Sequence, residues 1–333
     1  MERQARALHT RLEEELSAYK LPRYTFFVTN AEIPMTRAAR SARGEGGRGM
    51  SAGRIAEIWR YPVKSMGGEC IAQTGVGANG VPGDRAWAVR DEVRGGIRGA
   101  KKIPALMRCS ARYTSAPSAE RVPAPEIGLP GGDTLRADAP DANERVSTAV
   151  GTKVTLWPLR PASDLAHYKR GAPDSSDVSA ELRAVFGREP DEPLPDLSVF
   201  PKDLFMYESP PGTYFDAFPL LLLSTSSLRR AQQLAPASRV DVRRFRPNFV
   251  VEARDEGFPE LAWAGKRMRI GSAVLAVGVA CPRCVMITHG FDDLPKDPGL
   301  MRTLVREAGG IFGVYASVAE PGAIRVGDTL ELL

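Results

Sequence analysis

The sequence predicts a mainly β protein with some α-helix, in which a β-rich first half is followed by a barrel-like β domain. Three observations support this fold class. Most apolar segments are only as long as a strand, few segments have helical periodicity, and glycines and prolines mark turns between the segments. The 333 residues suffice for two modest domains or one elaborate domain.

The first half contains four predicted strands. Residues 55–61 alternate between apolar and polar side chains before Pro62, which predicts an edge strand that runs into a turn. Further strands are expected at residues 86–89, 107–113 and 153–157. Between them, residues 115–143 are rich in Pro, Gly, Ala and Asp, which favours a hairpin on a mobile insertion.

The second half begins with a predicted buried strand at residues 219–223. Ser224 to Ser227 can cap a following helix that carries Leu228, Ala231 and Leu234 on one face. More strands are expected at residues 249–252, 268–270, 273–279, 313–318 and 329–332. Many short strands with few helices are typical of a barrel-like β domain.

The chain divides into three predicted regions. Residues 1–50 form an extension with a Gly/Arg-rich end, which we expect to be disordered or to be sequence translated upstream of a natural start at Met50. Residues 51–185 form the first domain and residues 186–333 the second. The boundary is placed near residues 188–196, which are rich in proline and acidic residues.

Charge and composition exclude several classes of protein. The 45 basic residues are interspersed with 40 acidic ones, so the net charge of +5 does not indicate nucleic-acid binding. The longest apolar run, residues 218–223, is far shorter than the roughly 20 residues that span a bilayer. Four cysteines in so long a chain do not form a disulfide scaffold. We therefore expect a cytoplasmic protein that does not contact a membrane.

Cys281 and Cys284 follow directly after a predicted strand, where reactive groups can be held firmly and still be reached. The pair could bind zinc, form a thioredoxin-like redox centre, or consist of two buried structural thiols. Residues 285–288, which follow the pair, are expected to be strand-like, and this counts against a thioredoxin-like centre, which needs a helix there. The favoured hypothesis is that one cysteine is a soft thiolate ligand for a transition metal carried by an organic cofactor. Arg283 beside it would favour the ionised thiol.

Such a cofactor is anionic, so basic groups are expected to gather around it from other strand ends. Three turns supply them: Lys64 and Ser65 after the first strand, residues 80–85 ending in Arg85, and residues 243–248 around Arg246. Arg246 is the strongest candidate, because a guanidinium binds phosphate bidentately. We predict that these turns converge on one cysteine.

Seven segments occur in an order that resembles the MOSC domain family, which includes the mitochondrial amidoxime-reducing component and the C-terminal part of molybdenum cofactor sulfurase. The segments are YPVKS at 61–65, GDR at 83–85, KKIPAL at 101–106, DAFPLLLLS at 216–224, RFRPN at 244–248, CPRC at 281–284 and GAIRVGD at 322–328. Together they span nearly everything after Met50.

The resemblance implies an N-terminal β-barrel-like domain, a MOSC β-barrel domain and a molybdenum cofactor (Mo-molybdopterin) between them. It assigns Cys284 as the molybdenum ligand and catalytic residue, and it assigns the pterin and its phosphate to the basic turns. The residues expected to bind the cofactor are Lys64, Ser65, Arg85, Arg246, Asn248 and Arg283, with Cys281 in support. Phe218 departs from the family, which often has a small hydroxyl residue there, and the segment after Thr288 lacks the family's Asp-Pro-Asp turn.

The resulting prediction is a molybdenum-dependent oxidoreductase that reduces small N-hydroxylated compounds of the amidoxime or hydroxylamino type. The sequence has no ferredoxin-like cysteine cluster and no flavin-binding fingerprint, so electrons are expected from a separate donor protein. Two alternatives stay open: a non-catalytic carrier of the cofactor or of sulfur, and a structural barrel without cofactor.

Overall fold

Seven strands form a closed β-barrel. The structure, a computed structural model, describes residues 50–200 and 206–333. The predicted N-terminal extension lies outside these residues except for Met50, which begins the first strand. Within the described part, the barrel strands follow one another as β1 (Met50–Arg60), β11 (Phe249–Ala253), β10 (Leu220–Ser224), β14 (Ile311–Glu320), β13 (Ala273–Pro282), β12 (Arg267–Ile270) and β16 (Thr329–Leu332). The predicted barrel is therefore confirmed.

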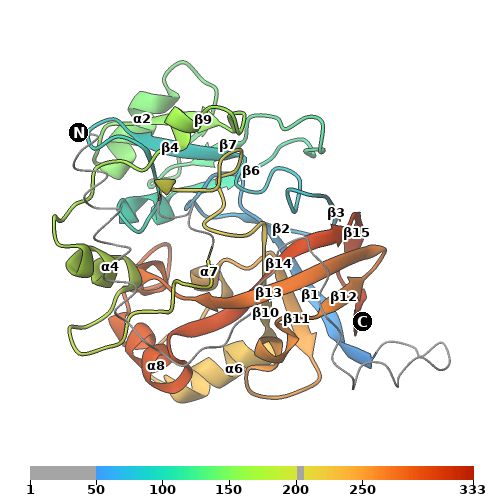
Figure 1. The fold of residues 1–333 in the computed structure, drawn as a ribbon. Coiled ribbons are helices and arrows are strands. Elements are labelled where there is room, and N and C mark those ends of the chain that lie inside the picture. The colour runs from blue at the N-terminus through green and yellow to red at the C-terminus, as the bar shows by residue number, and fades with distance from the viewer. Residues whose placement is uncertain (1–49, 201–205) are drawn as a thin grey trace.

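The first strand closes this barrel. Strand β1 pairs antiparallel with β11 on one side and with β16 on the other, and β2 (Glu69–Ile71) pairs with its end. Figure 1 shows this blue strand among the orange and red strands of the second half. The prediction of an edge strand was wrong, because β1 has a paired strand on both sides. Pro62 is compatible with this position, since it lies after the last paired residue, Arg60, and removes no hydrogen bond between strands. Closure leaves no unpaired sheet edge in the ring.

Alternating side chains fill the barrel. Ile55 and Ile58 of β1 meet Leu222, Phe249 and Leu275 in one core cluster, and each of these five is at most 1% exposed. Ile55 and Ile58 are three residues apart, and they share the inner face because the register of β1 against β11 shifts between Ile55 and Glu57. The β10–β11 pair is parallel, with helix α6 (Thr225–Leu234) as the crossover. Ser224 caps that helix by accepting a hydrogen bond from the Ser227 amide, as predicted.

The remaining first-half residues form a second unit with its own core. Its sheets have the orders β5-β4-β9 and β6-β7-β8, and helix α2 (Ala142–Val150) packs beside them. The strands are β4 (Trp87–Asp91), β5 (Ile97–Arg98), β6 (Ser110–Arg112), β7 (Glu126–Gly128), β8 (Thr134–Arg136) and β9 (Val154–Pro158). The predicted hairpin is β7–β8, and it is anchored rather than mobile, because Ile127 and Leu135 are buried in the core.

Two predicted strands are partly or wholly helical. Residues 107–113 begin within the 3-10 helix η2 (Pro104–Arg108), and only β6 is extended. Residues 285–288, expected to be strand-like, form the 3-10 helix η4 (Val285–Thr288). A short buried apolar run does not distinguish strand from helix by its pattern, which explains both errors.

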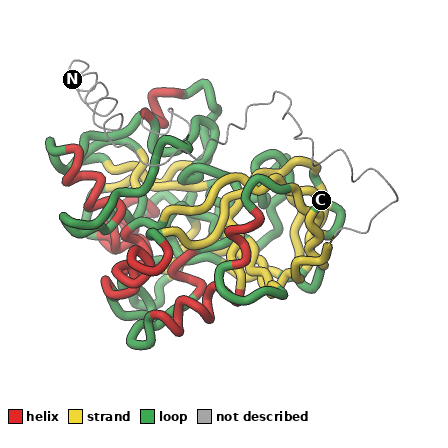
Figure 2. Tube along the Cα trace, turned by 60° about the horizontal axis from the view of Figure 1, so that its bottom comes forward, coloured by secondary structure: helices red, strands yellow, loops and turns green. Residues whose placement is uncertain are grey.

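Short helices cover the outside of the barrel at one end (Figure 2). Two further strands, β3 and β15, pair in a small separate sheet. The elements not yet named are β3 (Gln73–Val76), α3 (Leu165–Tyr168), α4 (Val178–Phe186), α7 (Val242–Phe245), η3 (Pro259–Trp263), α8 (Pro298–Ala308) and β15 (Gly322–Arg325).

The two units are joined by the segment that follows the CPRC motif. The core of the first-half unit contains three side chains of this segment, Met286, Phe291 and Leu294. Cys284 packs against the same core. The cysteine therefore lies where the two units meet.

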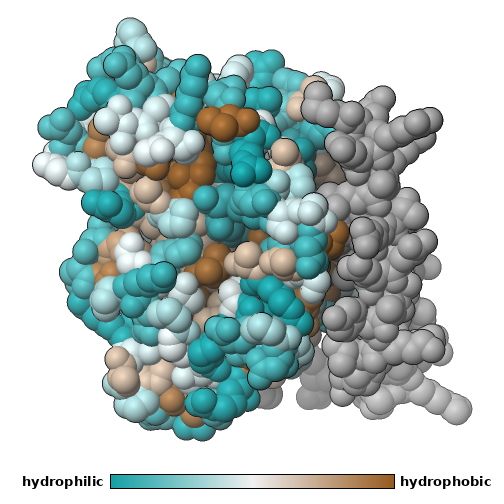
Figure 3. All heavy atoms as spheres, turned by 90° about the vertical axis from the view of Figure 1, so that its left-hand side faces the viewer, coloured by the Kyte–Doolittle hydropathy of each residue, from teal (hydrophilic) through white to brown (hydrophobic). Residues whose placement is uncertain are grey.

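The described surface is mixed in character. On the face drawn in Figure 3, hydrophobic side chains form small separate patches between hydrophilic ones. Among the described residues no helix is long and apolar enough to cross a bilayer.

We predict that shortening a β1 side chain destabilises the barrel although β1 lies far from its neighbours in sequence. Ile58→Ala should lower the free energy of unfolding by about 2–4 kcal/mol, because it leaves a cavity among fully buried side chains. Urea unfolding measures this. Val326→Ala, at a residue 46% exposed, is the control and should change stability by less than about 0.5 kcal/mol. Equal small effects would contradict the closing role of β1.

Candidate functional site

The buried carboxylate of Asp84 organises the second of the three predicted turns, residues 80–85. Asp84 accepts hydrogen bonds from the Tyr61 amide at 2.7 Å and from Asn248 Nδ2 at 3.0 Å, and it forms an ion pair with Arg85. Gly80 and Gly83 have positive φ angles of 76° and 79°, which allow the tight turn before it. The turn thus joins the end of β1 to the segment before β11.

Two arginines from distant segments lie against one tyrosine ring. The guanidinium carbon of Arg246 is 4.2 Å from the centroid of the Tyr61 ring, and that of Arg85 is 4.8 Å from it. Arg85 Nη2 also donates to the Arg246 carbonyl oxygen at 3.2 Å. Cation–π contact offsets part of the repulsion between the two guanidinium groups. Two of the predicted basic turns therefore meet at Tyr61.

Arg246 has an unused hydrogen-bond donor. Its Nη1 donates to the Met66 carbonyl oxygen at 2.6 Å, whereas Nη2 is buried without a partner among the described residues. The residue is only 8% exposed. Burial, and then the charge of Arg85, lower the pKa of Arg246 to about 10. An anion bound here would supply the missing acceptor and oppose both effects.

Three of the predicted residues have backbone conformations that side chains rarely adopt. Ser65, Arg85 and Arg246 have φ angles of 71°, 48° and 58°. Left-handed conformations outside glycine cost about 1–3 kcal/mol each and concentrate at functional sites. At these three positions the direction of the side chain is therefore obtained at the cost of an unfavourable backbone conformation.

Lys64 is buried and fully engaged. Its Nζ donates to Ser209 Oγ at 3.2 Å, to the Tyr214 carbonyl oxygen at 2.9 Å and to Asp216 Oδ1 at 2.8 Å. The following Ser65 Oγ accepts a hydrogen bond from the Ala100 amide at 2.9 Å. Lys64 and Ser65 thereby tie the end of β1 to two other segments.

Asp216 is shared by two lysines. Lys101 Nζ lies 3.3 Å from the same Oδ1 that binds Lys64. Although burial alone would raise it, the pKa of Asp216 is held well below the ordinary value by the charges of Lys101 and Lys64, with a further contribution from Arg85. Burial lowers the pKa of Lys64, and Asp216 only partly opposes this. Asp216 was not among the predicted site residues, although a carboxylate four residues before the buried apolar strand β10 is a signal.

Cys284 lies among positive charges. It is half-buried and precedes helix η4 as the N-cap residue. Burial alone would lower the pKa of Lys101. The interactions of this lysine with Asp216 and then with Cys284 are stronger, so its pKa is raised. Arg188 and Arg283 also interact electrostatically with Cys284. Nothing in the sequence pattern distinguishes Lys101 from Lys102 or singles out Arg188.

Arg283 contacts the other cysteine directly. Its Nη1 donates to Cys281 Sγ at 3.2 Å and its Nη2 to the Phe245 carbonyl oxygen at 2.8 Å, while Nε is buried without a partner in the described chain. Burial raises the pKa of the Cys281 thiol, and Arg283 and a hydrogen bond donated by the Tyr315 hydroxyl partly offset this. Cys281 is therefore a supported, buried thiol.

Two residues of the RFRPN segment act as braces. The fully buried Arg244 donates from Nη1 to the carbonyl oxygens of Ile287 and His289 and from Nη2 to that of Pro295. These bonds hold the loop after Cys284. Asn248 Nδ2 donates to Asp84, and its Oδ1 accepts from the Leu221 amide at 3.2 Å. Both side chains position backbone around the site.

Asp216 links the predicted residues into one neighbourhood. It pairs with Lys64 and Lys101, and its charge acts on Arg85 and Arg246, while Lys101 in turn interacts with Cys284. Lys64, Arg85 and Arg246 thus lie within the electrostatic influence of Asp216, and Lys101 connects Asp216 to Cys284. Asn248 and Arg283 lie at its edge, with their side chains engaged in bracing contacts.

The donor set fits an anionic group rather than a metal held by protein alone. Arg246 and Arg283 each keep a buried nitrogen donor without a partner in the described ranges. Over those same residues, no group of three or more His, Cys, Asp or Glu could hold a metal ion. One thiolate with surrounding cations suits a metal that an anionic cofactor brings with it.

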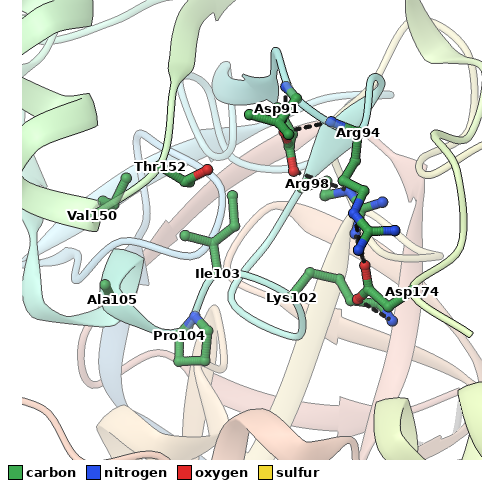
Figure 4. Close-up of a pocket in the computed structure, with 11 residues that line it drawn as sticks. Asp91, Arg94, Arg98, Lys102, Ile103, Pro104, Ala105, Val150, Thr152 and Asp174 are labelled. Atoms are coloured by element: carbon green, nitrogen blue, oxygen red, sulfur yellow. Dashed lines mark hydrogen bonds and ion pairs between the residues drawn. The ribbon is translucent and has the colours of Figure 1, made fainter.

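A cavity of about 300 Å³ lies on the other side of the KKIPAL segment. Figure 4 shows Lys102 beside Asp174 there, and these two side chains form an ion pair of 2.9 Å. Lys101 instead pairs with Asp216. Consecutive lysines thus serve different regions, and the cavity is separate from the surroundings of Cys284.

Family models match most of the chain. The model of the MOSC N-terminal beta barrel domain matches residues 52–160, and that of the MOSC domain matches residues 211–331.

Curated relatives match over similar lengths. Mitochondrial amidoxime-reducing component 1 of Homo sapiens is 26% identical, with 84% of this chain and 83% of the relative covered. The Mus musculus protein of the same name is 27% identical over 84% and 82%. Mitochondrial amidoxime reducing component 2 of Homo sapiens is 26% identical over 83% and 82%.

Solved structures give weaker matches. The YuaD protein of Bacillus subtilis has 13% identity and a TM-score of 0.38, with 85% of this chain and 96% of that chain covered. YiiM of Escherichia coli has 18% identity and a TM-score of 0.27, over 35% and 54%.

We predict that Asp216 stabilises the fold in a pH-dependent manner. Because its folded-state pKa is lowered, its contribution is present above about pH 4 and is lost as the pH falls through that lowered pKa. Asp216→Asn should lower the free energy of unfolding by about 1–2 kcal/mol at pH 7, a value reduced for its 43% exposed side chain. Urea unfolding at a series of pH values measures the difference.

Asp133→Asn is the matched control, because the side chain of Asp133 is 80% exposed in its ion pair. It should change stability by less than about 0.5 kcal/mol. A difference between wild type and Asp216→Asn that persists unchanged into strong acid would contradict the role given to the two lysines.

Proposed function

Because this chain belongs to the MOSC domain family, we propose that it is a molybdenum-cofactor-dependent oxidoreductase that reduces N-hydroxylated compounds. The observation that carries the proposal is the convergence of buried cations with unused donors on the region of one half-buried thiol. The names of the curated relatives, amidoxime-reducing components, support the reaction class. Amidoximes and hydroxylamino compounds are the proposed substrates.

In this proposal Cys284 is the ligand of molybdenum and the basic residues bind the pterin and its phosphate. Arg246 would offer its free Nη2 to the phosphate, with Arg85 beside it on the Tyr61 ring. Lys64, whose three donors are taken by the protein, would contribute its positive charge, and Ser65 beside it would offer its hydroxyl proton. Asn248 and Arg283 would fix the two segments that carry Arg246 and Cys284.

When bound, the cofactor supplies the two-electron chemistry that breaks the N–O bond, with two protons taken up and water released. The protein residues provide the environment for it. Lys101 stays protonated near Cys284 and would place a positive charge beside the anionic cofactor. Arg244 would keep the loop after Cys284 in place during turnover.

The electrons would come from a separate donor protein, as the sequence predicts. We also propose a cytoplasmic location, which the four free cysteines of the described chain support because thiols stay reduced there. The curated relatives are named as mitochondrial proteins.

We predict that Cys284→Ala abolishes amidoxime reduction and removes bound molybdenum while the fold stays intact. The protein is expressed in a host that makes the cofactor, metal content is measured by mass spectrometry, and activity is measured with an artificial electron donor. Cys70→Ala, at an exposed cysteine, is the control and should keep both properties. Molybdenum retained without any reduction in the wild type would indicate a carrier instead. Unfolding of Cys284→Ala would indicate a structural thiol.

We predict that Arg246→Ala loses cofactor before it loses structure. Removing a charge-assisted hydrogen bond worth about 1.5–3 kcal/mol should lower cofactor retention by about tenfold or more during gel filtration. Arg246→Lys should retain an intermediate amount, because it keeps the charge without the planar fork. Arg112→Ala, whose side chain is 67% exposed, should retain cofactor like the wild type. Full retention in Arg246→Ala would remove this residue from the proposed site.

A further inference from the structure

Three aromatic side chains form a cluster on the outside of the barrel. The rings of Phe218 and Tyr315 are stacked, with centroids 5.2 Å apart and planes at 26°. The ring of Phe200 lies 6.3 Å from each of them. All three residues are half-buried, so part of this aromatic surface stays accessible.

The strand register explains why Tyr315 faces outward. Its neighbours Val314 and Ala316 are fully buried in the barrel core, and successive side chains of a strand point to opposite faces. Phe218 lies over the β13 backbone at Gly278, where an added Cβ would be 3.7 Å from its ring. The stacked pair is therefore held by two strands of the barrel.

The aromatic cluster adjoins the surroundings of Cys284. Tyr315 interacts with the Cys281 thiol, and it also interacts electrostatically with Asp216 and Arg283. Phe218 follows Asp216 by two residues, and Asp216 is paired with Lys64 and Lys101. The accessible rings thus lie beside the charged residues that the proposed function uses.

We infer that the cluster of Phe200, Phe218 and Tyr315 selects N-hydroxylated substrates that carry a planar aromatic ring. Such a ring can stack on or meet the edge of these side chains, whereas an aliphatic chain lacks the electrostatic part of that contact. The polar head would then face the charged residues around Asp216. This inference rests on the proposed function and names the substrate class of the same site.

The test compares two substrates that differ only in the group beside the amidoxime. Holoenzyme is assayed with benzamidoxime and acetamidoxime, and kcat/KM is measured for the wild type and for Phe218→Leu. We expect the variant to lose about tenfold in kcat/KM for benzamidoxime and less than about twofold for acetamidoxime. Tyr315→Phe keeps the ring and should keep the preference. Phe258→Leu, at an aromatic residue that packs on Phe312 elsewhere, should leave both values unchanged.

A binding measurement separates this inference from the proposed function. Benzamidine and acetamidine are the amidines formed when the two amidoximes are reduced. They are not reduced further, so calorimetric titration with them measures binding alone. Benzamidine should bind the wild type more tightly than acetamidine, and Phe218→Leu should remove most of that difference.

The possible outcomes are distinct. An equal preference in wild type and Phe218→Leu, with both amidoximes reduced, overturns the inference and leaves the proposed function standing. Reduction of neither amidoxime overturns the proposed function. Benzamidine that binds no better than acetamidine overturns the inference by itself.

Discussion

The arrangement of this site depends on the hydrogen bonds and the ion pair that the carboxylate of Asp84 forms. Its side chain has no exposed surface, so its oxygens need donors from the protein. Those donors are the Tyr61 amide, Asn248 Nδ2 and the Arg85 guanidinium, which come from three segments far apart in the sequence. Removal of the carboxylate would leave a buried guanidinium without its counter-charge and would release the end of β1 from the segment that carries Arg246.

The barrel and the candidate site therefore share their main structural element. Strand β1 closes the ring between β11 and β16 and continues directly into Tyr61, Lys64 and Ser65. Because Ile55 and Ile58 are buried on the inner face, the strand cannot shift register without moving these side chains out of the core. The positions of these three residues are thus set by the packing of a barrel whose other strands come from the second half.

Local patterns in the sequence were sufficient for much of the fold but not for the precise shape of the site. Periodicity located most barrel strands, and a serine before a helical stretch located the start of α6. Pro62 led to the prediction of an edge strand. The pairing of β1 on both sides could not be predicted, because its partners are far away in the sequence and leave no local signal. The left-handed backbone conformations of Arg85 and Arg246 could not be predicted from the sequence either, since arginine does not favour this conformation.

The same distinction applies to the candidate residues. The basic turns could be proposed from composition, whereas the roles of Asp216 and Lys101 arise only when residues over 100 positions apart are brought together. Lys101 and Lys102 are identical in type and adjacent, yet tertiary contacts direct one to Asp216 and the other to Asp174. Sequence could thus predict which chemistry was available but not which of two equal neighbours would supply it.

The charge balance of the site provides the last step. Four cationic side chains, Lys64, Arg85, Lys101 and Arg246, face two carboxylates, Asp84 and Asp216, which leaves an excess of two positive charges. Glu208, which also acts on both lysines, is itself paired with Arg170 and does not change this balance. Burial is the main cause that lowers the pKa values of Lys64 and Arg246, and the neighbouring positive charges of Lys101 and Arg85 lower them further. A doubly charged phosphate would balance the excess and accept the free donor of Arg246. The proposed cofactor is therefore the type of ligand that this arrangement of charges favours on electrostatic grounds.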